Sequence, residues 1–292
     1  MNAKQKDKMW TGILYAVSTL VVLLLVILLG LIFFKGRYAL SLSFLFGNPK
    51  VGEAGGGIAP MLFNSFYMLV VSLTITIPLG VGAGIFLAEY AKDGRLVNII
   101  RLCIETLASL PSIVVGLFGM LVFVNMTHWG FSILAGSLAV AVINFPSLTR
   151  VSEDAIRSAS ASVKEASLGL GATNWQTIAK IIIPIAMPQI LTGVILASGR
   201  IFGESAALLF TAGMSAPPLH FDSLLSVSSP LNLFRPAETL SVYIWKLNSE
   251  GMVPDAADIA NKASAVLVLM VLIFNIISRV LGRKIYNKYS GK

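Results

Sequence analysis

Charged side chains are scarce in this chain of 292 residues. Lysine, arginine, aspartate and glutamate together make up 12% of it, whereas soluble domains carry about 25%. Hydrophobic residues make up 56%, and the mean hydropathy is +0.82. This composition excludes an ordinary soluble domain and predicts an all-α integral membrane protein.

Cysteine and histidine are nearly absent. Cys103 is the single cysteine, so no intramolecular disulfide can form, and its apolar surroundings favour a small buried hydrophobe. With two histidines and no H-E-x-x-H pattern, the chain has little from which to build a metal or catalytic site. The nucleotide-binding pattern G-x-x-x-x-G-K-[ST] is also missing. We therefore expect no metal and no cofactor in this chain.

Long apolar stretches are abundant. A bilayer core requires about 20 apolar residues per helix, and six stretches meet that length: 11–34, 61–88, 98–125, 131–149, 181–213 and 263–281. The first is too long for a signal peptide and lacks an A-x-A site, so we interpret it as a retained membrane helix. The short segment 126–130 between the third and fourth stretches requires the chain to reverse there.

The basic residues sit at the ends of the apolar stretches. Fifteen lie in segments that would share one side of the membrane with the N-terminus, and six lie on the other side. Basic residues concentrate in cytoplasmic segments, so both termini are predicted to be cytoplasmic. This distribution explains the net charge of +8 without nucleic acid and fits a multi-pass membrane protein.

The spans suggest a division of the chain. Residues 1–60 would form the first membrane helix and an outer loop, 61–281 the membrane core, and 282–292 a cytoplasmic tail. The core includes a long outer loop, 215–262. Its apolar patch 240–245 is too short to span, so we expect a short helix lying at the outer interface or dipping into the membrane.

One polar insert, 150–180, interrupts the apolar chain on the predicted cytoplasmic side. Glu153 and Arg157 are four residues apart and can pair on a helix that continues out of the fourth span. A second short helix is expected from Ser162 to Leu168, ending at Gly169 and Gly171. The spacing of Thr173 and Gln176 predicts a capping box at the start of the next helix.

Apolar side chains within this insert indicate a partner. A solvated linker has little use for Leu168, Leu170 and Trp175, whereas a compact elbow that presents them would fit a socket in another protein. The alternative is a plain linker that lets the chain turn back. The residues alone leave both interpretations open.

Arg200, Glu204 and Glu105 are ionisable residues that fall within the spans. A charge in hydrocarbon costs roughly 2.5–3.5 kcal/mol even on lenient scales, so such residues usually face the bundle interior and mark a pathway. Arg200 and Glu204 are four apart, which would place them on one helix face. The alternative for this pair is a structural ion pair. Glu105 would otherwise end a hydrogen-bond network or lie at the cytoplasmic edge.

Serines near these charges are weaker candidates for the pathway. Their hydroxyls would donate to an anionic substrate, although serines in membrane helices more often permit close packing. The candidates are Ser109, Ser112 and Ser205.

The insert resembles the EAA motif of ABC importer permeases, EAA-x3-G-x9-I-x-LP. Glu165-Ala166-Ser167 is followed at the family spacing by Gly171, Ile181 and Ile183-Pro184, with Ser167 and Ile183 as mild departures. The resemblance implies a coupling helix at about 162–172 that docks on a cytoplasmic ATPase. Its contact residues would be Glu165, Ala166, Ser167, Leu168, Gly171 and Trp175.

Other stretches are similar to phosphate importer permeases of the PstA type. They are 56–60 (GGIAP), 87–91 (LAEYA), 105–114 (ETLASLPSIV) and 200–212 (RIFGESAALLFTA). The resemblance implies six spans in the type I importer plan and no catalysis by this chain. It also implies a paired PstC-type permease, a PstB-type ATPase dimer that binds ATP and Mg²⁺, and an external PstS-type phosphate-binding protein, all at the lipid membrane of a bacterial or archaeal cell. The alternatives are a permease for another oxyanion, an ion-gradient-driven transporter and a membrane-embedded enzyme.

Overall fold

The computed structural model describes the chain except for residues 1–2, 51, 93, 220–228, 252 and 290–292. The described residues form helices, and the isolated bridge between Pro49 and Gly56 is their only β pairing. The helices are α1 (Ala3–Lys35), α2 (Leu42–Phe46), α3 (Ala59–Ile85), η1 (Phe86–Tyr90), α4 (Arg95–Ser109), α5 (Ser112–Gly119), η2 (Met120–Met126), α6 (Ile133–Gly169), α7 (Asn174–Thr177), η3 (Ile178–Ile182), α8 (Ile183–Gly203), α9 (Ala206–Thr211), α10 (Leu240–Glu250) and α11 (Ala256–Tyr289). The three η segments are wide π-helical turns that continue or precede an α-helix.

Five helical stretches are long and apolar enough to cross a membrane: Ala3–Lys35, Ala59–Tyr90, Ile133–Gly169, Asn174–Gly203 and Ala256–Lys284. A sixth stretch passes the same test only as a pair, Arg95–Ser109 with Ser112–Met126, which is bent by 100°. The prediction of an all-helical, polytopic membrane protein is therefore confirmed. The predicted continuous span 98–125 is wrong, because this segment is a broken helix.

Pro111 explains the break. The residue before a proline is pushed out of the helical region, and Leu110 is extended, with φ −68° and ψ 134°. Pro111 is extended as well, and α5 begins directly after it. The chain thus turns sharply at Leu110–Pro111.

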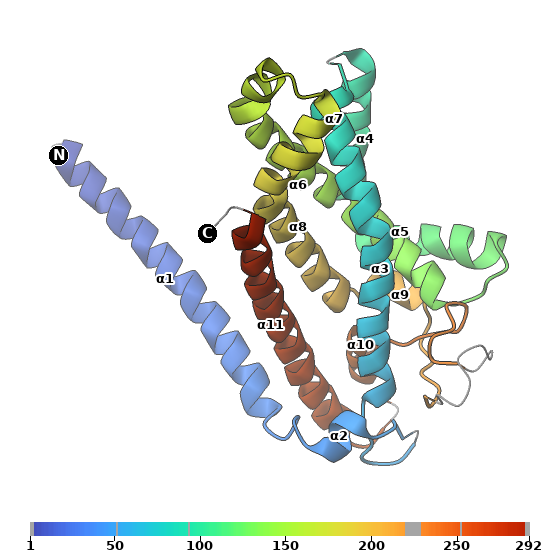
Figure 1. The fold of residues 1–292 in the computed structure, drawn as a ribbon. Coiled ribbons are helices and arrows are strands. Elements are labelled where there is room, and N and C mark those ends of the chain that lie inside the picture. Colours follow the sequence, from blue (N-terminus) through green and yellow to red (C-terminus); the bar gives the residue numbers. More distant parts are fainter. Residues whose placement is uncertain (1–2, 51, 93, 220–228, 252, 290–292) are drawn as a thin grey trace.

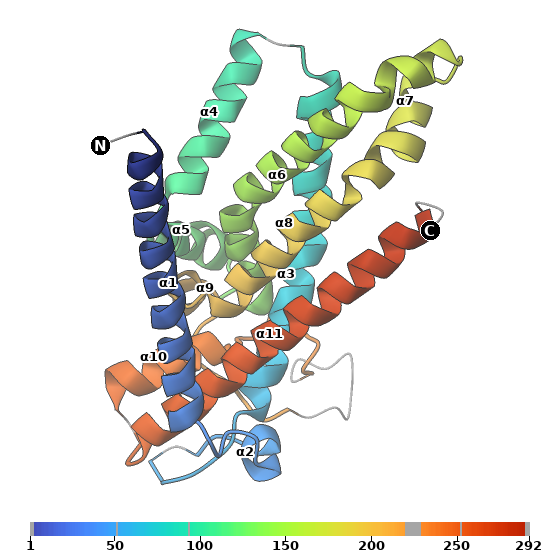
Figure 2. The same cartoon turned by 90° about the vertical axis from the view of Figure 1, so that its left-hand side faces the viewer.

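Helices α3, α6, α8 and α11 run along the length of the molecule (Figures 1 and 2). One apolar cluster joins α6, η3 and α8 through Ile156, Ile178, Ile182 and Ile190, all of them buried. Helix α1 has no buried residue and leans away from the bundle at its N-terminal end. The bend between α6 and α7 lies at the opposite end of the bundle from α2 (Figures 1 and 2).

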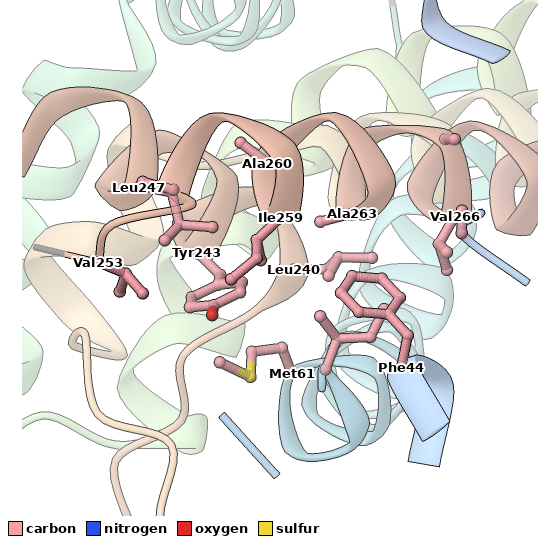
Figure 3. Packing of buried hydrophobic residues seen from close by; sticks show 14 residues of the cluster. Phe44, Met61, Leu240, Tyr243, Leu247, Val253, Ile259, Ala260, Ala263 and Val266 are labelled. Carbon is pink, nitrogen blue, oxygen red and sulfur yellow. The ribbon is translucent and has the colours of Figure 1, made fainter. Parts of the chain in front are cut away.

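A second cluster closes the end of the molecule near α2. Phe44 of α2, Met61 of α3, Leu240 of α10 and Ile259 of α11 are all buried there, as Figure 3 shows. The predicted short helix around 240–245 is confirmed as α10. Because its first residues are buried, α10 belongs to the core of this end of the protein.

Helices α3 and α6 approach each other closely at Gly84. A Cβ atom at this position would lie 2.5 Å from Ser152 Cβ and 2.9 Å from the Glu153 nitrogen. Both of those residues belong to α6 and are buried. A larger residue at Gly84 would have to push the two helices apart.

We predict that Gly84→Val destabilises the protein by about 1–3 kcal/mol, because overpacking a tight contact costs that amount. The measurement is the thermal unfolding midpoint of the detergent-purified protein. Gly82→Val is the matched control, since a Cβ atom on Gly82 of the same helix would meet nothing within 4 Å. Equal midpoints for the two variants would contradict a packing role for Gly84.

Candidate functional site

Two helix breaks meet at a small cavity of about 170 Å³. Arg200 and Glu204 line it from the end of α8, and Ser112 lines it from the start of α5. Its other lining residues are Leu107, Ala108, Leu110, Val115 and Ile143. The structure thus brings together three of the residues that the sequence marked for a pathway. A cation, a carboxylate and a hydroxyl share a space that is otherwise apolar.

Arg200 and Glu204 do not share a helix face, so that prediction is wrong. Helix α8 ends at Gly203, and Glu204 adopts an extended conformation with ψ 121°. Its Oε1 accepts a hydrogen bond from the Ala207 nitrogen at 3.1 Å, and its carbonyl oxygen accepts one from Ser241 Oγ at 2.6 Å. The described ion pairs do not include Arg200. The two residues face one cavity without neutralising each other by direct contact.

Arg200 also lines a second cavity of about 300 Å³ between α6 and α8. Asn144 and Ser147 of α6 contribute polar groups to this cavity. Asn144 is fully buried, and its Oδ1 accepts no hydrogen bond among the described residues. Asn144 and Ser147 were not among the pathway residues predicted from the sequence. The feature of the sequence that could have identified them is a polar side chain within the apolar fourth span, 131–149.

The remaining pathway candidates, Glu105, Ser109 and Ser205, are not among the lining residues of the cavity at Arg200 and Glu204. Glu105 is exposed and forms an ion pair of 3.1 Å with Arg150 at a different cavity, of about 210 Å³. The Ser109 hydroxyl donates to the Thr106 carbonyl at 2.7 Å. Ser205 precedes α9, and its side chain makes no capping hydrogen bond. A role for these three residues in transport stays a prediction.

The polar insert forms a tight elbow. Instead of a separate short helix over Ser162–Leu168, α6 continues without a break to Gly169. At about 1.5 Å per residue, its 37 residues extend roughly 55 Å, well beyond the roughly 30 Å of a bilayer core. The chain then reverses through Gly171, which has φ +86°. The elbow is therefore built at the tip of a projecting helix.

Hydrogen bonds define the elbow in detail. The Gly171 nitrogen donates to the Leu168 carbonyl at 2.9 Å, and the Ala172 nitrogen donates to the Ser167 carbonyl at 3.2 Å. These two bonds are the Schellman pattern of a helix end. The predicted capping box of Thr173 and Gln176 is confirmed at the start of α7.

A buried hydroxyl pair joins the two arms of the elbow. Ser167 Oγ and Thr177 Oγ1 are 2.8 Å apart, and both residues are buried. Ser167 is the position where the chain departs from the alanine of the EAA pattern. A serine is useful here because Thr177 offers its hydroxyl a partner.

The outer surface of the elbow is largely apolar. Trp175 is 63% exposed and Leu170 is 90% exposed, while Leu168 is at 37%. Glu165 and Ala166 are exposed beside them. A projecting tip with these side chains uncovered has the features of a contact surface for another protein.

Ion pairs connect this tip to the neighbouring helices. Lys164 Nζ lies 2.7 Å from Glu89 Oε2 of η1, the turn that continues α3, and the Glu89 side chain is 2% exposed. The predicted pair of Glu153 and Arg157 is confirmed at 3.1 Å, and Glu153 also contacts Arg101 of α4 at 3.0 Å. The Lys164 pair therefore connects the region of the tip to η1, and the pair of Glu153 with Arg101 connects an earlier part of α6 to α4.

At the opposite end of the bundle, buried polar groups hold the loop before α10. Arg235 donates to Asn64 Oδ1 at 2.7 Å and to the Pro230 carbonyl at 2.9 Å. Glu238 is 2% exposed and pairs with Lys246 at 3.2 Å. Burial raises the pKa of Glu238 from 4.5 to about 7, against the opposing effect of Lys246.

Comparison with known proteins decides the family. Residues 80–290 match the model of the family described as binding-protein-dependent transport system inner membrane component. The chain belongs to this family. It is an ABC importer permease subunit, a multi-pass inner membrane protein that is not itself catalytic.

Individual relatives agree with this assignment. The permease is 53% identical to the probable ABC transporter permease protein YqgI of Bacillus subtilis over the full length of both chains. It is 36% identical to the phosphate transport system permease protein PstA of Yersinia pestis, covering 86% of this chain and 81% of that protein. In a bacterial ABC transporter involved in alginate import, one chain has the same fold. Its TM-score is 0.61 at 15% identity, over 97% of this chain and 99% of that chain.

We predict that the permease loses stability as the pH rises from 4.5 to about 7. The Glu238 carboxyl holds its proton more tightly in the folded than in the unfolded protein. Its contribution to the free energy of unfolding is therefore fully present below pH 4.5 and is lost as the pH rises through the folded pKa of about 7. Thermal unfolding midpoints at about pH 5 and about pH 8 measure this dependence.

Glu238→Gln should flatten that pH dependence, because glutamine does not titrate. Glu53→Gln is the matched control, since Glu53 is an exposed acid whose side chain is 73% accessible. An unchanged pH dependence in Glu238→Gln would show that Glu238 does not titrate in this range.

Proposed function

We propose that this chain is the permease subunit of an ATP-driven phosphate importer and forms half of the translocation pathway. The observation that carries the proposal is the cavity where Arg200, Glu204 and Ser112 meet. A PstA-type permease is among the relatives at 36% identity. The cavity favours a tetrahedral oxyanion, and the relatives favour phosphate among these anions.

The chemistry of the cavity suits a tetrahedral oxyanion. A guanidinium offers a planar fork of donors that matches phosphate oxygens, and Ser112 adds a hydroxyl. Glu204 is positioned to accept a hydrogen bond from a protonated phosphate oxygen. At roughly 30 Å³ per water molecule, the 170 Å³ space holds several waters or one small oxyanion.

The position of Arg200 favours a pathway shared with a second permease. Arg200 is exposed on the single chain, and it lies in an apolar helix beside Leu196, which is 68% exposed. A charged side chain on an apolar membrane helix requires a polar or aqueous neighbour. A paired permease of the PstC type would close the pathway on this side.

The elbow provides the connection to ATP. We place Glu165, Ala166, Ser167, Leu168, Gly171 and Trp175 at the contact with a PstB-type ATPase dimer, which binds ATP and Mg²⁺. Phosphate would reach the outer face on a PstS-type binding protein. From Pro184 to Arg200, α8 is continuous over about 24 Å. Closure of the ATPases would move this helix and switch the cavity between outward and inward access.

Of the alternatives, transport driven by an ion gradient does not fit the family of this chain. Another tetrahedral oxyanion fits the same donors and remains the second candidate for the substrate. Competition by sulfate, arsenate and phosphate in a transport assay distinguishes these substrates.

We predict that Arg200→Gln abolishes phosphate uptake, because glutamine keeps a polar hydrogen-bonding group but lacks the charged, forked guanidinium. Uptake of radioactive phosphate into cells that express the complete transporter measures the effect, and copurification of the ATPase tests assembly. Arg95→Gln is the control for loss of one positive charge on an exposed helix start. Normal uptake by Arg200→Gln would make the arginine structural.

We predict that Gly171→Val uncouples ATP hydrolysis from uptake. Its φ of +86° is strained for a β-branched residue, although the space around it is open. Gly169→Val is the control, because Gly169 lies two residues away in equally open space and lacks a positive φ. The ratio of phosphate moved to ATP hydrolysed should fall in Gly171→Val alone. Equal ratios in both variants would argue against the elbow as the coupling element.

A further inference from the structure

A groove between α8 and α11 forms a cavity of about 520 Å³ that the transport pathway does not use. Its lining residues are Pro188, Leu191, Thr192 and Ile195 of α8, with Arg279, Gly282 and Arg283 of α11. The groove thus combines aliphatic walls with two guanidinium groups.

Close helix packing forms the floor of this groove. Gly282 is buried, and a Cβ atom there would overlap the Leu191 side chain, so the two helices touch at this point. Thr192 Oγ1 donates to the Pro188 carbonyl at 2.9 Å and therefore adds little polarity to the wall. The α8 wall is consequently apolar, and the polar groups of the groove are the two arginines.

Arg279 and Arg283 are suited to act together. They are four residues apart on one helix, so they share a face, and both are exposed. Within the described part of the chain, neither belongs to an ion pair. They lie in the last turns of the apolar span Ala256–Lys284, at the end that the charge distribution places in the cytoplasm. This is the level of the lipid headgroups of the inner leaflet.

We propose that this groove binds an anionic phospholipid of the cytoplasmic leaflet. The headgroup phosphate accepts hydrogen bonds from Arg279 and Arg283, and an acyl chain lies along Leu191 and Ile195. Basic pockets between membrane helices on the cytoplasmic side are suited to such headgroups. The apolar wall favours a lipid over free inorganic phosphate, since a small ion gains nothing from aliphatic contacts. Two arginines without an acidic partner favour an anionic lipid over a zwitterionic one.

Native mass spectrometry of the detergent-purified, full-length chain tests the proposal. The protein is mixed with equal amounts of phosphatidylglycerol and phosphatidylcholine, and the retained lipid adducts are counted. The wild-type protein should retain phosphatidylglycerol preferentially. In the double variant Arg279→Gln/Arg283→Gln this preference should fall about 30-fold. Each basic residue near the membrane surface contributes about 1 kcal/mol, and about 1.4 kcal/mol corresponds to a tenfold change in binding.

Two further variants separate charge from shape. Arg95→Gln/Lys180→Gln removes two exposed basic residues on the same side of the membrane and should keep the preference. Thr192→Trp fills the groove from its exposed edge without removing a charge and should lose the bound lipid.

Three results would overturn the proposal. The first is equal retention of the two lipids by the wild-type protein. The second is a preference unchanged in Arg279→Gln/Arg283→Gln, or lost equally in Arg95→Gln/Lys180→Gln. The third is displacement of the lipid by an excess of inorganic phosphate, which would identify a free-phosphate site.

Discussion

A helix that is interrupted within a membrane must satisfy its broken backbone inside the protein, because the bilayer core offers no water. Within the described residues, this permease is interrupted in this way at Leu110–Pro111 and at Glu204–Ser205. The structure places them against each other: Gly116 of α5 packs directly on the backbone of Ala207 of α9. The helices that follow the two breaks therefore cover each other's backbone. The polar residues that the breaks expose, Arg200, Glu204 and Ser112, consequently face one space.

The other polar region, the elbow, is stable for different reasons. It projects beyond the apolar spans, and its own hydrogen bonds define its shape: a helix end at Gly171, a capping box at Thr173 and a buried hydroxyl pair. Its ion pair with Glu89 involves a nearly inaccessible carboxylate, for which losing its partner would be costly. This ion pair therefore attaches α6, just before the elbow, to η1 at the end of the second membrane helix. The large side chains Leu170 and Trp175 are left on the outside of the elbow.

Much of this organisation could be predicted from the sequence. Apolar runs and basic flanks identify the membrane helices, and the spacing of Thr173 and Gln176 identified a helix start that the structure confirms. The interruptions could not be predicted from hydropathy, because a broken span is as apolar as a straight one. Pro111 was the visible signal for the first break, and Gly203 was a weaker one for the second. Placing Arg200 and Glu204 on one helix face failed because helical spacing was extended across that break.

The site could be predicted only in part. Its charged members stood out because charge is rare in an apolar span, whereas Asn144 and Ser147 are ordinary polar residues until α8 packs beside them. Likewise, Glu105 carried the same sequence signal as Glu204, yet it pairs with Arg150 elsewhere. Only the three-dimensional packing of the helices shows that Glu204 lines the cavity with Arg200 and that Glu105 does not.

The wide turn Ile178–Ile182 lies between the elbow and the straight part of α8. Such a π-helical turn amounts to one residue inserted into an α-helix, and one residue corresponds to a rotation of about 100° around the helix axis. The turn therefore sets the angular phase between the face that carries Trp175 and the face that carries Arg200. Both motifs could be intact in a permease and still point in the wrong relative directions if this single turn were regular.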